Sequence, residues 1–136
     1  MDVGEHMAEG SFATVINCMD GRTQLPLNEW ARREFGVDHV DTITEPGPNG
    51  ILAGKDRVLT ESIRKRVGIS VNGHGSKVIV LVGHHDCAGN PGPRGMQNDH
   101  TMKGISIIEK WGFDARMVGV YVGEDWKVEI IHDSEA

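Results

Sequence analysis

Two short segments of the sequence carry side chains that suit metal binding. The first is Cys18 to Arg22 (CMDGR), and the second is His84 to Cys87 (HHDC). A histidine and a cysteine three positions apart on a tight loop can face one ion, and a cysteine from another segment completes a Cys2His set. Three protein ligands with an open fourth position are typical of catalytic zinc sites that activate water. We therefore predict one Zn2+ per chain, bound by Cys18, His84 and Cys87.

The ligand types favour zinc over magnesium and calcium, which prefer oxygen ligands. Cobalt and ferrous iron accept the same ligand types, so the residues alone leave these metals open.

Asp20 and Arg22 form a second component beside the predicted ligand Cys18. In an extended segment, alternate side chains point the same way, so we expect both to lie near the metal. The guanidinium should keep the Asp20 carboxylate ionised. That carboxylate can orient a metal-bound water, or it can occupy the fourth position and close the site. The simpler interpretation is a surface salt bridge beside a turn.

Other polar residues near these segments are weaker candidates. His85 and Asp86 lie between two predicted ligands, where one of them can relay protons, although such residues more often cap or turn a loop. His100 is a further candidate for the relay. We expect His39 and His74 to be surface groups.

The predicted elements alternate between strands and helices. Strand-like runs cover 12–17, 39–44, 77–82, 117–122 and 127–132, and helical spacing covers 26–35, 56–71 and 98–111. Pro26 suits a first helical turn, Gly36 suits a helix end, and 46–50 has the composition of a loop. In the last predicted helix, Met102 is expected to face inward.

This order predicts an α/β fold in one domain, residues 1–136, with 1–10 as a flexible N-terminal segment. The sheet should be mostly parallel, with helices on both faces and a final antiparallel strand. Ligands bind such sheets at the carboxyl ends of the strands, where the strand order reverses. Cys18 follows the first strand and His84 the third. If these strands are neighbours, the predicted ligands meet at that edge.

The bulk composition excludes several classes of protein. The formal charge of −6 argues against nonspecific nucleic-acid binding. No apolar run approaches the roughly 20 residues that span a bilayer. The first ten residues are polar and acidic and lack an apolar signal core, so we expect a cytoplasmic protein without a structural disulfide.

The two segments together resemble the motifs of β-class carbonic anhydrases. CMDGR fits the pattern C-x-D-x-R, and GHHDC fits G-H-x-x-C. The resemblance extends from Ser11 to about His132, in the expected order of elements. It implies zinc bound by Cys18, His84 and Cys87, with Asp20 and Arg22 as the catalytic pair.

The resemblance also implies reversible hydration of carbon dioxide to bicarbonate, and assembly as a homodimer or a higher oligomer of dimers. Members of the family switch between an open site and one in which the aspartate ligates zinc.

The sequence departs from the family in ways that identify a small, divergent member. An Arg-Asn-Ala-Gly stretch is usual after the second strand, whereas this chain has Thr44 to Gly47 and shares only Gly47. Glu45 places a negative charge there, which disfavours bicarbonate. The chain is also shorter at the N-terminus and before the fourth strand.

Two alternatives to carbon dioxide hydration stay open, and the altered loop leaves room for the first. One is hydrolysis of carbon disulfide or carbonyl sulfide by the same zinc ligands. The other is a non-catalytic zinc protein in which Asp20 permanently closes the site.

Overall fold

The computed structural model describes residues 8–136, which form a five-stranded sheet in the order β2-β1-β3-β4-β5. The strands are β1 (Phe12–Cys18), β2 (His39–Glu45), β3 (Val78–His84), β4 (Arg116–Val122) and β5 (Val128–Asp133). All neighbouring pairs are parallel except β4 and β5, which are antiparallel. The predicted fold class is therefore confirmed. Residues 1–7 of the predicted flexible N-terminal segment lie outside the described part of the chain.

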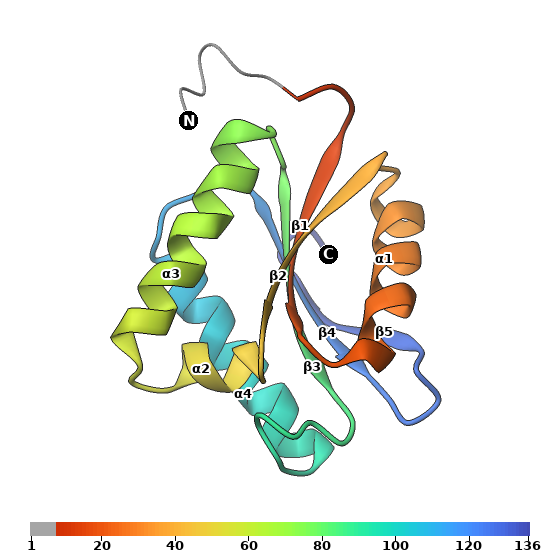
Figure 1. The fold of residues 1–136 in the computed structure, drawn as a ribbon, viewed down its shortest axis with the longest axis vertical. Helices are drawn as coiled ribbons and strands as arrows, with labels where there is room; N and C mark the ends of the chain where they lie inside the picture. Colours follow the sequence, from red (N-terminus) through yellow and green to blue (C-terminus); the bar gives the residue numbers. More distant parts are fainter. Residues whose placement is uncertain (1–7) are drawn as a thin grey trace.

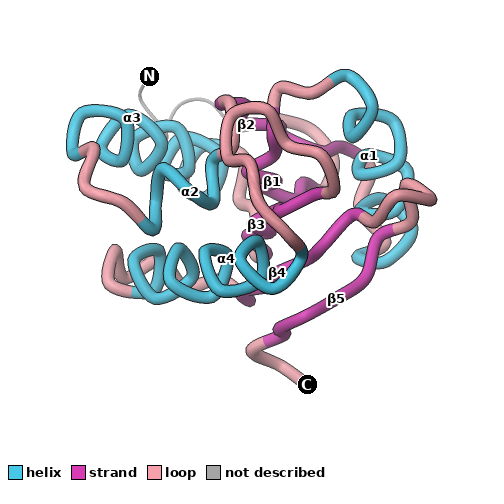
Figure 2. The backbone as a smooth tube through the Cα atoms, turned by 90° about the horizontal axis from the view of Figure 1, so that it is seen from below, coloured by secondary structure: helices cyan, strands magenta, loops and turns pink. Residues whose placement is uncertain are grey.

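Helices cover both faces of this sheet. The helix α1 (Gly21–Phe35) lies on one face, and α2 (Pro48–Ala53), α3 (Arg57–Gly68) and α4 (Arg94–Glu109) lie on the other (Figures 1 and 2). A π-helical turn, η1 (Ile69–Gly73), follows α3 directly. After β1, the chain adds β2 on one side of that strand and then crosses over to add β3 on its other side. The strand order therefore reverses between β1 and β3, as predicted.

The sheet separates two hydrophobic cores, one under each helical layer. Val15 of β1 packs toward α1 with Leu27, whereas the next residue, Ile16, packs toward α3 with Ile63. This alternation follows from the two-residue period of a strand. Every residue of β3 is buried, as expected for a central strand covered on both faces. The two layers thus fix β1 and β3 beside each other.

The helix α1 begins five residues before the predicted start at Pro26. The Asp20 carboxylate accepts a hydrogen bond of 2.8 Å from the backbone N–H of Arg22 and caps the first turn. Pro26 lies inside the helix, and Gly36 ends it in a left-handed conformation (φ 61°), as predicted. Asp20 and Arg22 consequently lie at a helix start, and the prediction of an extended segment there is wrong.

Three further boundaries differ from the predictions. The predicted loop 46–50 contains the start of the short helix α2, which packs extensively on α4. The helix predicted over 56–71 divides into α3 and η1, and α4 starts at Arg94. Met102 is 40% exposed and does not face inward.

His74 differs from the predicted surface group. Its Nδ1 atom lies 2.6 Å from the Asp41 carboxylate, which also accepts a hydrogen bond from Ser70. The imidazole stacks on Phe12, with ring centroids 4.3 Å apart. His74 therefore helps to join η1 to β1 and β2, whereas His39 is exposed as predicted.

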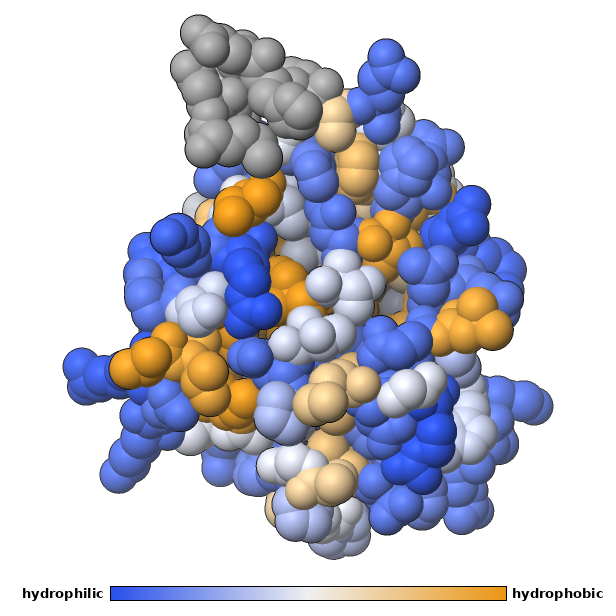
Figure 3. Space-filling view, viewed as in Figure 1, coloured by the Kyte–Doolittle hydropathy of each residue, from blue (hydrophilic) through white to orange (hydrophobic). Residues whose placement is uncertain are grey.

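The surface is mainly hydrophilic over the face shown in Figure 3, where hydrophobic residues form separate groups among polar ones. None of the helices within residues 8–136 is both long enough and apolar enough to span a membrane.

Candidate metal centre

Three side chains that can bind a metal converge at the carboxyl edge of the sheet. Cys18 ends β1 and His84 ends the neighbouring strand β3, while Cys87 lies on the loop that follows. The two Sγ atoms are 3.9 Å apart, and the three potential ligand atoms all lie within 4.8 Å of one another. The structure therefore brings together all three predicted ligands, and each of them is buried.

The hydrogen bonding of His84 leaves one ring nitrogen available to bind a metal. Its Nδ1 atom lies 2.7 Å from the backbone oxygen of His85, and since a carbonyl only accepts, Nδ1 carries the hydrogen. Nε2 is then an acceptor, and it is buried without a hydrogen-bond partner in the described residues. Leaving a buried acceptor unpaired is unfavourable. A metal ion bound by the three side chains would satisfy it.

The two thiols titrate as a pair. The hydrogen bond with Cys87 lowers the pKa of Cys18 despite its burial, and the same contact raises the pKa of Cys87. The backbone N–H of Gly47, 3.5 Å from the Cys18 sulfur, also stabilises the Cys18 thiolate. Burial lowers the pKa of His84, but the nearby Cys18 sulfur and the hydrogen bond with the His85 carbonyl outweigh it and raise the pKa. The contacts between the two thiols therefore favour ionisation of Cys18 over Cys87.

The donor set fits a transition metal of the zinc type. Two cysteine sulfurs and one imidazole nitrogen are ligands that zinc accepts in tetrahedral sites. Magnesium and calcium would require oxygen donors. Asp20 is not part of the cluster of close ligand atoms, so three protein donors are present for a four-coordinate ion.

Asp20 and Arg22 form an ion pair beside this cluster. The shortest contact is 2.6 Å, from Arg22 Nη2 to Asp20 Oδ2. The hydrogen bonds from Arg22 lower the pKa of Asp20 from 3.8 to about 2, so the carboxylate is ionised, as expected. The negative charge of Asp20 also contributes to the raised pKa of His84. Asp20 lies two residues after Cys18, at the start of α1, where Arg22 holds its carboxylate.

The loops around the cluster approach each other too closely for side chains. Gly47 has φ 61°, and a Cβ atom on it would lie 2.6 Å from the Cβ of Asn90. A Cβ on Gly89 would lie 2.5 Å from the backbone of Pro46. These two glycines let the loop after β2 pack on the loop that carries Cys87. The close packing delivers the Gly47 N–H to the Cys18 sulfur.

Glu45 does not face the cluster as a free negative charge. Its carboxylate pairs with Arg66 of α3 at 3.3 Å, and its side chain is largely buried. The departure from the family at this position is therefore electrostatically compensated by a cation on α3.

A buried network of polar side chains, which was not predicted from the sequence, holds the loop that carries Cys87. The Asn49 amide donates to the Gln97 side chain at 2.9 Å and to Thr101 at 3.2 Å, and its oxygen accepts from Asn90 at 3.1 Å. The predicted relay candidate His100 contacts Asn90 at 3.1 Å and so joins this network. No spacing in the sequence indicates the network, because α2, α4 and the loop meet only in the folded chain.

Two further residues near the ion pair were not predicted to contact Arg22. Asp86, expected to turn the loop, has φ 56° and pairs with Arg22. Trp126, in the turn between β4 and β5, lies over the Arg22 guanidinium. A tryptophan in a turn carries no sequence signal for such a contact.

The fold and the cluster together define a small α/β protein with a candidate transition-metal centre at the point of strand reversal. The chain belongs to the family described as "Putative carbonic anhydrase", whose model matches residues 8–132. The family inferred from the two motifs is therefore confirmed. A comparison with curated proteins gave no match.

Solved β-carbonic anhydrases share the fold. Isoform I from Trichomonas vaginalis matches with a TM-score of 0.58 and 17% identity, over 93% of this chain and 86% of that one. One of two tetrameric enzymes from Sordaria macrospora matches with a TM-score of 0.55 and 13% identity, over 91% of this chain and 82% of the other. At these identities the likeness establishes the architecture.

Proposed function

We propose that this chain binds one zinc ion through Cys18, His84 and Cys87 and catalyses the reversible hydration of carbon dioxide to bicarbonate. The observation that carries the proposal is the unpaired, buried Nε2 of His84, which lies in a buried cluster with the sulfurs of Cys18 and Cys87, all three ligand atoms within 4.8 Å of one another. Membership of the carbonic anhydrase family supports the reaction. When bound, zinc would act as a Lewis acid and lower the pKa of a coordinated water toward neutrality.

The residues of the chain supply orientation and charge. The ionised Asp20 carboxylate can accept a hydrogen bond from the nucleophilic water. This hydrogen bond would direct a lone pair of the water toward carbon dioxide. Arg22 holds that carboxylate through contacts from Nε and Nη2. Asp20 is thus bound to Arg22 and to the start of α1, which favours an open fourth position over the closed, non-catalytic alternative.

We also propose that the protein assembles as a homodimer or a higher homo-oligomer. The Sordaria macrospora enzymes with this fold are tetrameric. The exposed apolar side chains of Met19 and Leu25, close in sequence to Cys18 and Asp20, offer a surface for such contacts.

Metal analysis followed by stopped-flow carbon dioxide hydration tests the function. We expect about one zinc per chain and turnover that rises between about pH 7 and 9, the range in which a zinc-coordinated water would lose a proton. Asp20→Asn keeps a good helix cap but removes the charge, and we expect it to retain zinc and to lose about 100-fold or more in kcat.

The exposed residue Asp114 provides a matched control, because Asp114→Asn removes the same charge elsewhere. Absence of zinc would contradict the whole proposal. Zinc-loaded protein that is inert toward carbon dioxide at every pH would contradict the reaction, and assays with carbonyl sulfide and carbon disulfide then test the hydrolase alternative.

A further inference from the structure

Backbone strain in this protein gathers around one side chain. Among residues 8–136, the non-glycine residues with positive φ are Asp86 (56°) and Trp126 (60°). The left-handed region is unfavourable for a bulky residue such as tryptophan and persists only where the surrounding structure enforces it. Both residues contact Arg22.

The Arg22 guanidinium is held on two edges and one face. Asp20 accepts hydrogen bonds from Nε and Nη2, and Asp86 accepts from Nη1 at 3.2 Å through its carboxylate and from Nη2 at 3.1 Å through its backbone oxygen. The Trp126 ring centroid lies 4.7 Å from Cζ. These partners come from the start of α1, the loop after β3 and the turn between β4 and β5.

The ion pair between Arg22 and Asp86 is weak when taken alone. The side chains of Arg22 and Asp86 are 46% and 71% exposed, and ion pairs at such positions are screened by water. An aromatic face adds attraction for the cation and restricts the rotamers that Arg22 can adopt. The combination therefore fixes a side chain that the ion pairs alone would leave mobile.

We propose that Trp126 and Asp86 are positioning residues that hold Arg22, and through it keep the Asp20 carboxylate away from the fourth metal position. This proposal rests on the proposed function. Trp126 is close enough to act there, since its ring centroid lies 6.5 Å from that of His84. Releasing Arg22 frees Asp20 to compete with water for the metal.

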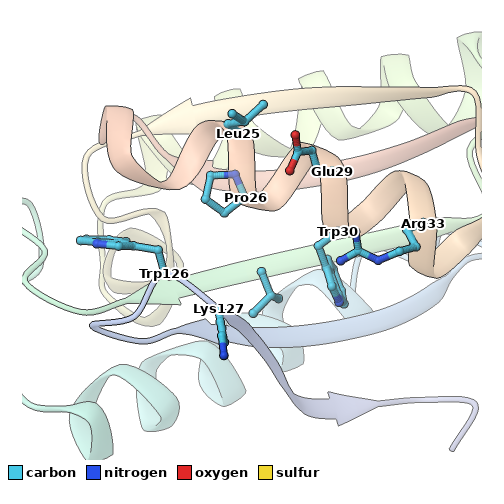
Figure 4. Close-up of a pocket in the computed structure, with 8 residues that line it drawn as sticks. Leu25, Pro26, Glu29, Trp30, Arg33, Trp126 and Lys127 are labelled. Carbon is cyan, nitrogen blue, oxygen red and sulfur yellow. The ribbon is translucent and has the colours of Figure 1, made fainter.

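The strained position of Trp126 also has a purely structural explanation, and the test must distinguish that explanation from a positioning role. It lines a cavity of about 550 Å³ with Leu25, Pro26 and Trp30 of α1 (Figure 4). Trp126→Phe keeps an aromatic face, whereas Trp126→Leu keeps an apolar side chain without one. A cavity role depends on apolar volume, and a positioning role depends on the aromatic face.

The first measurement is the NMR signal of the Arg22 Nε–H, recorded on full-length protein with and without zinc. In Trp126→Leu we expect its hydrogen exchange to accelerate at least about fivefold, and in Trp126→Phe to stay within about twofold of wild type. Trp111→Leu, which removes an indole packed on Phe113, should leave the signal unchanged. An unchanged exchange rate in Trp126→Leu overturns the proposal.

Asp86→Asn keeps a residue that tolerates left-handed backbone and removes only the charge. It should accelerate the same exchange at least about twofold, and an unchanged rate would overturn the role of Asp86 even if Trp126→Leu does not fold.

The second measurement is azide binding to the cobalt-substituted protein, followed by visible absorption. If Asp20 reaches the metal in Trp126→Leu, azide affinity falls about fivefold there and is preserved in Trp126→Phe. Faster Arg22 exchange with unchanged azide affinity overturns the link to Asp20. Failure to bind zinc or cobalt refutes the proposed function, while the NMR measurement still decides whether Arg22 is held.

Discussion

Cys87 is the candidate ligand whose position depends most on the loop rather than on a strand. Its sulfur lies 3.9 Å from that of Cys18, so replacing it with serine removes one soft donor and leaves the geometry nearly unchanged. We expect Cys87→Ser to lower bound zinc below about 0.1 per chain after dialysis, because a neutral hydroxyl is a poor zinc ligand. Metal analysis by mass spectrometry measures this directly.

His85 offers the control for that experiment. Its side chain is half-buried and lies beside Trp126, outside the cluster of ligand atoms. His85→Ala should therefore keep a full complement of zinc. Equal zinc content in Cys87→Ser and wild type would remove Cys87 from the ligand set.

The residues of the candidate centre were predictable because their chemistry is local to two short motifs. Cys18 and His84 directly follow strand-like runs, and the strand order that joins them follows from the alternation of strands and helices. The contact of Trp126 with Arg22 was not predictable. It depends on the twist of the β4–β5 turn across the sheet edge, and no period or motif in the sequence encodes that position.

At the scale of elements, the short helix α2 shows why some boundaries were missed. Its sequence contains proline, asparagine and glycine, which individually favour a turn. Packing on α4 and the buried Asn49 amide hold it helical. The start of α1 was missed for a related reason, since Pro26 obscured a cap that Asp20 provides six residues earlier.

The Asn49 network should contribute measurably to the stability of the fold. Asn49→Ala leaves the buried amide of Gln97 and the half-buried amide of Asn90 short of partners, at a cost of about 1–3 kcal/mol in the free energy of unfolding. Urea denaturation followed by circular dichroism measures this loss. Asn28→Ala, on the half-exposed surface of α1, should change the free energy by less than about 0.5 kcal/mol. Equal effects of the two substitutions would contradict the role assigned to the network.

The pairing of β4 with β5 should depend on pH. Arg116 donates two hydrogen bonds to Asp133, at 2.9 and 2.6 Å, and these lower the pKa of Asp133 from 3.8 to about 2. Because the folded-state pKa is below the unfolded value, the pair stabilises the fold above about pH 4, and the contribution disappears as the pH falls toward 2.

We therefore expect Asp133→Asn to lower the stability at neutral pH by about 1 kcal/mol, allowing for solvent screening. The difference from wild type should shrink between pH 4 and pH 2, as thermal unfolding at a series of pH values will reveal. A constant difference across that range would exclude the ion pair as its cause.

At the scale of the whole molecule, the proposed assembly should bury the exposed side chains near the candidate centre. Met19 and Leu25 are 63% and 66% exposed in the single chain. We expect sedimentation at micromolar concentration to show a dimer or a larger species, and Leu25→Glu to shift it toward the monomer, since a charge in an apolar contact is unfavourable.

Val58 on α3 is 81% exposed on the opposite face of the sheet and provides the matched control. Val58→Glu should leave the assembly unchanged. A wild-type protein that sediments as a monomer at these concentrations would contradict the proposal.

The position of the two cysteines in the chain has a consequence for biosynthesis. They are separated by 69 residues, and they meet only after β3 has paired with β1. Pairing of such distant segments is slow, because the entropy of closing the intervening loop must be lost first. On the ribosome, Cys18 therefore emerges long before its partners, and its thiol must stay reduced and unligated until residue 87 has been synthesised. We expect metal binding to be among the last steps of maturation and to stabilise a sheet that has already formed.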